Sequence, residues 1–361
     1  MNIAYLALTG RASDLANRLW EQTGGKLYTK QTMGTRPFAQ WVSEAWKSCD
    51  ALVFIMASGI AVRSVAPLLE SKVCDPAVIV MDGRGQFVIS LLSGHIGGAN
   101  ELAVKLAEIS GGQAVLTTGT DVEQTLAFDV FAKEHGCVIE NIGELKYISG
   151  AMIEKEPVDV YCCSEKDFTF PENVRVFGLS EGHAANMADS RHITADTAVV
   201  IAHPFSHPDL SAKYAHVLYL RPKNLYIGIG CKKNTAPEAM AQAFLDFLKH
   251  LSLSPKSIAG MGTIDLKAGE PAILQLSEHF GLPLTIVERQ TLEALENAGR
   301  VNVSAFVKET TGVGSVCEGC ALALAEAGGG RARLVCEKTK YPGMTFALAE
   351  GRFPAMRLAE S

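Results

Sequence analysis

The chain has 361 residues, 48% of them hydrophobic and 20% charged, and its formal net charge is −6. A chain of this length exceeds one ordinary hydrophobic core, so two or three domains are expected. The negative charge excludes a generally basic nucleic-acid binder, and no apolar run reaches the roughly eighteen residues that a membrane-spanning helix requires.

Nine cysteines, an odd number, are scattered through apolar segments and argue against a disulfide framework. They predict a reducing compartment, so we expect the protein in the cytoplasm. The first ten residues, MNIAYLALTG, lack a cationic segment and are interpreted as a strand instead of a signal peptide.

Strands and helices alternate through residues 1–135, which we predict to form an N-terminal α/β domain. Apolar runs predict strands at Ile3–Leu8, Ala51–Met56, Val78–Val80, Gln86–Leu92 and Ala114–Leu116. Helical spacing predicts helices at Ala12–Gln22, Phe38–Lys47, Ile60–Leu69 and Val122–His135. Asp82-Gly83-Arg84-Gly85 is typical of a hairpin. The predicted fold class is multi-domain α/β, with parallel or mixed sheets flanked by helices and glycine-rich βα turns at the site edge.

The turn Ser93-Gly94-His95-Ile96-Gly97-Gly98 lies between a predicted strand and a predicted helix. Backbone N–H groups and a helix N-terminus are expected there, and both attract anions. Tight backbone geometry alone also explains glycines in such a turn, whatever binds. The pattern is neither G-x-G-x-x-G nor a P-loop, so a nucleotide is not specifically indicated. His95, alone between glycines, has little packing reason to be there and is the candidate functional residue.

Three turns of this domain follow strands: Ala57–Gly59, Ser93–Gly98 and Thr117–Asp121. In a parallel sheet all three would lie along one edge, where α/β proteins keep their sites. Asp121 is alternatively an N-cap, and Arg63 is alternatively a solvated helix residue. The candidate binding residues of this edge are Ser58, Gly59, Arg63, Ser93, Gly94, Gly97, Gly98, Asn100 and Thr118, with His95 and Asp121 as the candidate catalytic pair.

Residues 136–221 are less regularly patterned and are interpreted as a variable middle domain. The segment Arg221-Pro222-Lys223-Asn224 is interpreted as a linker. Residues 222–361 then form a predicted C-terminal α/β domain, in which glycine turns and lysines again follow strands. Its candidate binding residues are Gly230, Lys232, Lys233, Asn234, Asp265, Lys267, Gly314, Ser315, Lys338 and Lys340.

A C-x-x-C pair, Cys317 and Cys320, falls in an alanine-rich predicted helix. Zinc ribbons need a second pair at a suitable spacing, and none is present, so small-residue packing is favoured over a metal or redox role. No protein metal site is predicted.

Five motifs together carry a resemblance to a known family. They are Phe54–Ile60 (FIMASGI), Leu92–Asn100 (LSGHIGGAN), Gly228–Thr235 (GIGCKKNT), Thr263–Lys267 (TIDLK) and Gly312–Val316 (GVGSV). In this order the chain resembles the CbiG family of anaerobic vitamin B12 biosynthesis, whose members have N-terminal, variable middle and C-terminal domains. Cys317 and Cys320 depart from the small apolar residues expected after the last motif.

The resemblance implies a cobalt-precorrin-5A hydrolase activity, which opens the ring-A lactone of a cobalt corrinoid and releases acetaldehyde. It implies a carboxylate-fringed macrocycle as substrate, cobalt carried by the substrate and no cofactor of the protein's own. Neighbouring pathway methyltransferases are candidate partners. His95 would be the near-neutral base that activates water, with Gly97 and Gly98 N–H groups stabilising the oxyanion; Asp121 is the alternative base. The sequence leaves two other functions open, a non-catalytic corrinoid carrier and a nucleotide-dependent α/β enzyme.

Overall fold

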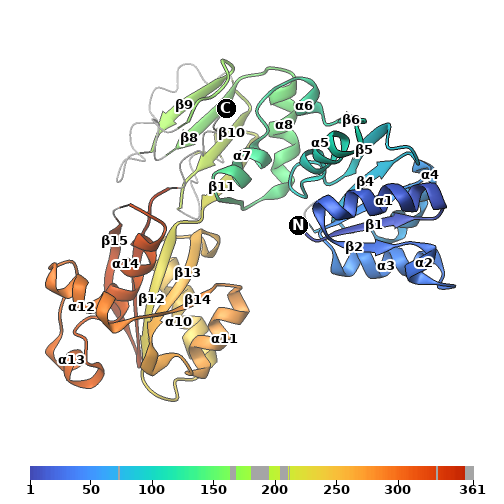
Figure 1. The fold of residues 1–361 in the computed structure, drawn as a ribbon. Helices are drawn as coiled ribbons and strands as arrows, with labels where there is room; N and C mark the ends of the chain where they lie inside the picture. The colour runs from blue at the N-terminus through green and yellow to red at the C-terminus, as the bar shows by residue number, and fades with distance from the viewer. Residues whose placement is uncertain are drawn as a thin grey trace. The chain divides into compact units, whose positions relative to one another are not determined.

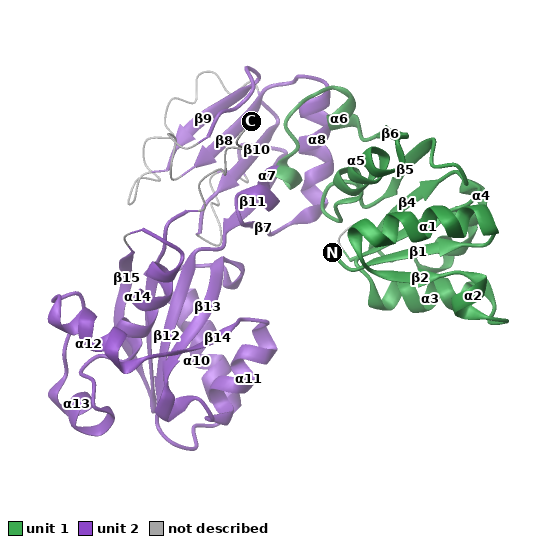
Figure 2. Cartoon of the chain, viewed as in Figure 1, with its two compact units in different colours: residues 1–130 green, residues 131–361 purple. Residues whose placement is uncertain are grey.

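The computed structural model describes residues 1–71, 74–162, 168–179, 195–203, 210, 212–330 and 332–353. The chain divides into two compact units, Met1–Val130 and Phe131–Ser361 (Figure 2). The described residues form three sheets, one in the first unit and two in the second (Figure 1). The division into three domains inferred from the sequence stays a prediction, whereas the predicted α/β fold class is confirmed.

The first unit is built on a six-stranded sheet with the order β2-β1-β3-β4-β5-β6. Its strands are β1 (Ile3–Ala7), β2 (Lys26–Tyr28), β3 (Ala51–Ile55), β4 (Ala77–Met81), β5 (Phe87–Leu92) and β6 (Gln113–Val115). Every residue of β1, β3 and β4 is buried, because helices cover both faces of the sheet. The helices of this unit are α1 (Gly10–Thr23), α2 (Lys30–Met33), α3 (Phe38–Ser48), α4 (Ser58–Val65), α5 (Ala99–Ser110) and α6 (Gly119–Val122).

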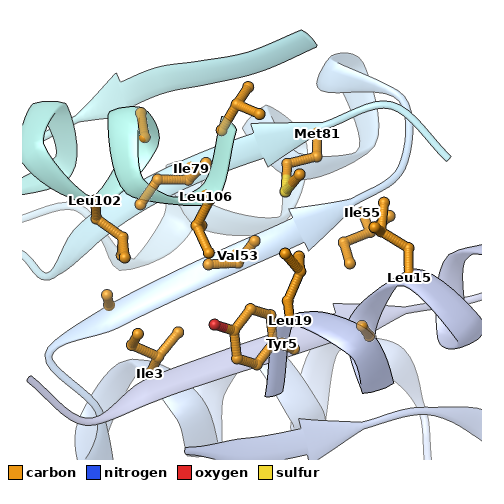
Figure 3. Packing of buried hydrophobic residues seen from close by; sticks show 14 of the residues in the cluster. Ile3, Tyr5, Leu15, Leu19, Val53, Ile55, Ile79, Met81, Leu102 and Leu106 are labelled. Carbon is orange, nitrogen blue, oxygen red and sulfur yellow. The ribbon is translucent and has the colours of Figure 1, made fainter. Parts of the chain in front are cut away.

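Alternation along the strands divides the core between the two faces of the sheet. On one face, Tyr5 and Val53 pack beneath Leu19 of α1 and Leu106 of α5 (Figure 3). On the other face, Phe54 packs with residues of α3 and α4. The helix α5 that carries the candidate site is therefore anchored by a continuous apolar core.

The strand directions overturn one expectation from the sequence. Strands β1, β3 and β4 are parallel, but β5 runs antiparallel to β4, with Leu92 opposite Val78. The turn after β5 thus lies at the edge where β4 begins, whereas Ala57–Gly59 lies at the opposite edge. Since β6 is parallel to β5, only the turns Ser93–Gly98 and Thr117–Asp121 share an edge. The predicted edge with three turns was wrong.

The second unit begins with α7 (Phe128–Glu134), which crosses the boundary, and a five-stranded sheet with the order β7-β11-β10-β8-β9. Its elements are β7 (Cys137–Ile139), α8 (Leu145–Ile153), β8 (Val158–Cys162), β9 (Val174–Gly178), β10 (Thr197–Ile201) and β11 (His216–Pro222). The predicted linker at 221–224 is too long, because Arg221 and Pro222 end β11 and Lys223 and Asn224 alone join it to the next strand at Leu225. Arg221 is fully buried at the end of β11, where its Nε donates to Glu140 Oε2 at 3.1 Å, and Asn224 is buried too.

The last sheet has the order β14-β13-β12-β16-β15. Its strands are β12 (Leu225–Cys231), β13 (Ile258–Ile264), β14 (Leu284–Val287), β15 (Arg333–Tyr341) and β16 (Met344–Glu350), and its helices are α10 (Pro237–His250), α11 (Pro271–Phe280), α12 (Arg289–Asn297), α13 (Ala305–Thr311) and α14 (Cys317–Ala327). Strands β12, β13 and β14 are parallel, so their carboxyl ends share one edge. Gly230 belongs to β12 and not to the turn that was predicted to begin there.

Across the part of the chain that the structure describes, none of the helices has both the length and the apolar character needed to cross a membrane.

Candidate active site

The turn after β5 is closed by its own backbone. Ala99 N–H donates to Ser93 O at 3.2 Å and Asn100 N–H to Gly94 O at 3.0 Å. Ser93 is held at a φ of +55°, a left-handed conformation that a residue other than glycine rarely adopts. A Cβ at position 97 would lie 2.5 Å from Ser93 Cβ, so only glycine fits there. Backbone strain and close approach of this kind are concentrated at functional sites.

His95 lies between two carboxylates. Its Nδ1 is 3.1 Å from both oxygens of Asp129, and its Nε2 is 2.9 Å from Asp121 Oδ2. The His95 side chain is 9% exposed and that of Asp129 13%, whereas the Asp121 side chain is 36% exposed. The cluster therefore has a buried end at Asp129 and an end open to solvent at Asp121. The contacts of His95 are polar, and the expectation that it has little packing role stays a prediction.

Asn100 fixes the open end of this cluster. Its Nδ2 donates to Asp121 Oδ2 at 2.7 Å and to Thr118 Oγ1 at 3.1 Å. A carboxylate accepts and cannot donate, so the amide nitrogen must face Asp121. Asp121 Oδ2 consequently accepts hydrogen bonds from both His95 and Asn100, which orient its carboxylate.

The two carboxylates determine the charge of His95. The hydrogen bond to Asp129 is the largest cause that raises the pKa of His95 to about 9; burial opposes it, and Asp121 adds to the increase. Burial by itself would raise the pKa of Asp129, but the hydrogen bond and charge of His95 outweigh it and leave that pKa lowered. At neutral pH the cluster is an imidazolium between two carboxylates. The sequence predicted an imidazole with a pKa near neutrality, and the pKa in the structure is higher.

The two N–H groups predicted to stabilise the oxyanion, those of Gly97 and Gly98, are not both free to do so. Gly98 N–H donates to His95 O at 3.0 Å within the turn, so this group is already used by the fold. Gly97 N–H is the remaining candidate of the predicted pair. The sequence of the turn does not reveal which of its N–H groups donate to carbonyl groups of the turn itself.

The structure brings four of the predicted polar residues of the first unit into one hydrogen-bonded cluster: His95, Asn100, Thr118 and Asp121. It places Ser58, Gly59 and Arg63 at the opposite edge of the sheet, where Arg63 Nη1 donates to Gly59 O at 3.0 Å. Asp129 was missed because residues 122–135 were predicted as one helix. In fact α6 ends at Val122 and α7 begins at Phe128, and this break lets Asp129 reach His95.

In the second unit, backbone N–H groups at three predicted binding positions donate to glutamates of the same unit. Gly314 and Ser315 N–H groups both donate to Glu296 Oε1, and Asn234 N–H donates to Glu270 Oε1 at 2.7 Å. These three positions were predicted to bind substrate, and the backbone donor of each is already occupied. Two other predicted residues are also paired: Asp265 with Arg289 at 3.1 Å and Lys267 with Glu270 at 3.4 Å.

Four predicted lysines of this unit remain available for an anion. The side chains of Lys232, Lys233, Lys338 and Lys340 form no ion pair within the described residues. Lys232 and Lys233 follow β12 directly and are exposed at the carboxyl edge of the sheet. The charge available to a ligand at this edge is therefore carried by side chains instead of by backbone N–H groups.

Cys317 and Cys320 are both buried where α14 packs against the sheet. A Cβ at Gly228 would collide with the carbonyl of Cys317, so the helix lies directly on β12. Burial raises the pKa of the Cys317 thiol to about 11 and raises that of Cys320 further. Both side chains are therefore neutral thiols in a close helix–sheet contact, as a packing role requires.

We expect the double substitution Cys317→Ala and Cys320→Ala to leave turnover within a few fold and to lower the free energy of unfolding by about 1–3 kcal/mol through lost packing. Steady-state kinetics and denaturant unfolding measure the two effects. One zinc per chain in metal analysis of the wild type, lost in the variant, would contradict the packing role.

Comparison with known proteins identifies matching models along most of the chain. The Cobalamin synthesis G N-terminal model matches residues 40–121, the Cobalamin biosynthesis central region residues 126–222, and the Cobalamin synthesis G C-terminus residues 225–349. Cobalt-precorrin-5A hydrolase of Salmonella typhimurium is 30% identical over 96% of this chain and 97% of its own length. The Priestia megaterium protein of the same name is 31% identical over 69% of this chain and 67% of its own. A crystal structure of a cobalamin biosynthesis protein G homolog from Sulfolobus solfataricus covers 97% of both chains at 21% identity, with a TM-score of 0.38.

Proposed function

The chain belongs to the CbiG family of cobalamin synthesis proteins, and on this premise we infer that it is a cobalt-precorrin-5A hydrolase. Its two relatives with that name support the assignment. The reaction adds water to the ring-A lactone of the cobalt corrinoid and releases acetaldehyde to give cobalt-precorrin-5B. The observation that carries the chemistry is the position of the His95 ring between the carboxylates of Asp121 and Asp129.

Lactone opening begins with the attack of water on the acyl carbon, and the water must lose a proton as it attacks. Asp121 is the exposed member of the cluster, and its Oδ1 is not among the atoms that His95 and Asn100 engage. We assign Asp121 as the base and His95 as the proton donor to the departing alkoxide. In this assignment Asp129 keeps His95 charged and oriented and does not touch substrate.

Carbon–carbon cleavage follows from the opened lactone. After lactone opening Asp121 holds the proton taken from water and His95 is neutral, so this proton first passes from Asp121 to His95 Nε2, 2.9 Å away. The hydroxyl on the former meso carbon then loses its proton to the regenerated Asp121 carboxylate, its C–O bond becomes a carbonyl, and the adjacent carbon–carbon bond breaks. The electron pair of that bond passes to the conjugated macrocycle, and the carbonyl fragment leaves as acetaldehyde. A cluster that first removes a proton from water and then one from the hydroxyl serves both steps.

The carboxylates of the substrate need cations, and we assign Lys232 and Lys233 to them. Replacing both lysines by Ala is expected to weaken corrinoid binding by about 1–3 kcal/mol, the range for hydrogen bonds to charged groups. Added salt should weaken wild-type binding in the same direction. Lys249→Ala, at the other end of α10, is the matched control. Equal affinity of the double variant and the wild type in a titration followed by corrinoid absorbance would move the anion site elsewhere.

Three further proposals accompany this function. The protein acts in the cytoplasm, in keeping with the eight described cysteines, which are all free thiols. It uses no cofactor of its own, and cobalt arrives in the substrate. Its partners are the corrinoid and, in handing intermediates on, neighbouring pathway methyltransferases.

Incubation of the purified chain with cobalt-precorrin-5A tests the function through two products. Acetaldehyde, trapped with a hydrazine reagent, and the macrocycle that has gained water and lost acetaldehyde, identified by its mass, should form in equal amounts. Binding without acetaldehyde would indicate a carrier. A nucleotide-dependent enzyme would instead show a rise in melting temperature with a nucleotide; the family membership does not favour either alternative.

A further inference from the structure

Three exposed apolar side chains lie around the carboxyl edge of the last sheet. Leu266, Val303 and Phe306 are 55%, 54% and 76% exposed. We call these three residues the apolar edge. Phe306 belongs to α13, a helix in which no residue is buried, and Figure 1 shows α13 at the same end of the sheet as the loop that follows β12. Apolar side chains exposed at one edge of a sheet are candidates for a binding surface.

Specific contacts hold the apolar edge in place. Arg289 pairs with Asp265 at 3.1 Å and donates from Nη1 to Thr311 O at 3.0 Å, which joins the Leu266 loop to the end of α13. Ser304 N–H donates to Gly314 O at 2.8 Å and closes the loop that carries α13. The side chains are thus exposed although the backbone beneath them is fixed, and a fixed apolar surface binds with a smaller loss of entropy.

Cations lie at the same edge as these apolar side chains. Glu270 connects the Asn234 turn, which follows Lys232 and Lys233, to Lys267 near Leu266. The two exposed lysines form no ion pair within the described residues. Among the acidic groups nearby, Asp265 is paired with Arg289 and Glu309 is exposed on α13. An apolar surface beside these two exposed lysines is the complement of a flat ring fringed with carboxylates.

We propose that the apolar edge receives one face of the corrin macrocycle, with Phe306 against the ring and Lys232 and Lys233 against the peripheral carboxylates. The proposal rests on the proposed function and deepens it by assigning a surface to the ring itself. An aromatic side chain packs well on a conjugated or apolar face. The two lysines favour a carboxylated macrocycle as the ligand, because a neutral apolar partner would leave their charges without a counter-charge.

Two corrinoid probes separate the two kinds of contact. Cobyrinic acid carries free carboxylates, and its fully amidated form keeps the macrocycle without those charges. Binding of each to the full chain is followed by corrinoid absorbance. Phe306→Ala should weaken both probes by about twofold to tenfold, the equivalent of losing an aromatic packing contact. The double variant Lys232→Ala, Lys233→Ala should weaken the acid and leave the amide unchanged.

Phe87→Ala is the matched control, because Phe87 is 51% exposed on the first unit and should leave both affinities unchanged. A Phe306→Ala variant that binds both probes like the wild type would overturn the proposal, and acetaldehyde release by that same variant at the wild-type KM would do so independently. Because wild-type acetaldehyde release is assayed separately, loss of this proposal leaves the proposed function standing. A wild type that releases no acetaldehyde would instead remove the function.

Discussion

Asp121→Asn should release acetaldehyde about two to four orders of magnitude more slowly than the wild type, the usual contribution of general acid–base catalysis. The amide still accepts from Asn100 through its oxygen, so the cluster keeps its shape, but it can no longer take a proton from water. We therefore expect the loss in kcat, with KM within a few fold. Single-turnover measurement of acetaldehyde with saturating substrate isolates this step.

Glu123→Gln is the control for Asp121, because it removes one carboxylate charge from an exposed position two residues away. It should keep the wild-type rate. An Asp121→Asn variant that retains activity within a few fold would exclude Asp121 as the base. The base would then have to be His95 in its deprotonated form, and the rate of that variant would rise with pH through the pKa of the imidazole.

The hydrophobic pattern was sufficient to predict most strands and the α/β class, because buried strands such as Ala51–Ile55 are continuous apolar runs. The relative directions of the strands were harder to infer. Asp82–Gly85 was read as a hairpin, and the hairpin is present between β4 and β5. A hairpin reverses the chain, so the turn after β5 could not share an edge with the turn after β3. The hairpin was predicted correctly from local residues, but its effect on which turns share an edge depends on the topology of the whole sheet.

The candidate site shows a similar division between local and long-range information. His95 and Asp121 were found because unusual residues in strand-ending turns are a local feature. Asp129 could not be found in this way, since its role depends on a break between α6 and α7 that the helical spacing of 122–135 conceals. In the second unit, Glu296 reaches Gly314 from 18 positions away. Sequence shows that a glycine turn offers N–H groups but not which carboxylate of the fold will occupy them.

His95→Gln should lose about two to four orders of magnitude in acetaldehyde release at neutral pH, because glutamine cannot donate a proton to the departing alkoxide. The wild-type rate should fall as pH rises through about 9, where the imidazolium loses its proton. This is opposite to the acid limb expected of a near-neutral imidazole. Asp129→Asn should move the alkaline limb to lower pH, because the hydrogen bond to Asp129 is the largest cause of the raised pKa.

The free energy of unfolding should also depend on the protonation of His95. The pKa of His95 is raised from 6.5 in the unfolded chain to about 9, so its contribution is complete below about pH 6.5 and is lost as pH rises through about 9. Denaturant unfolding between pH 6 and pH 10 should show this loss in the wild type and less of it in His95→Gln. A His95→Gln variant that keeps most of its activity yet loses this pH dependence would leave His95 as a clamp between two carboxylates, with no part in proton transfer.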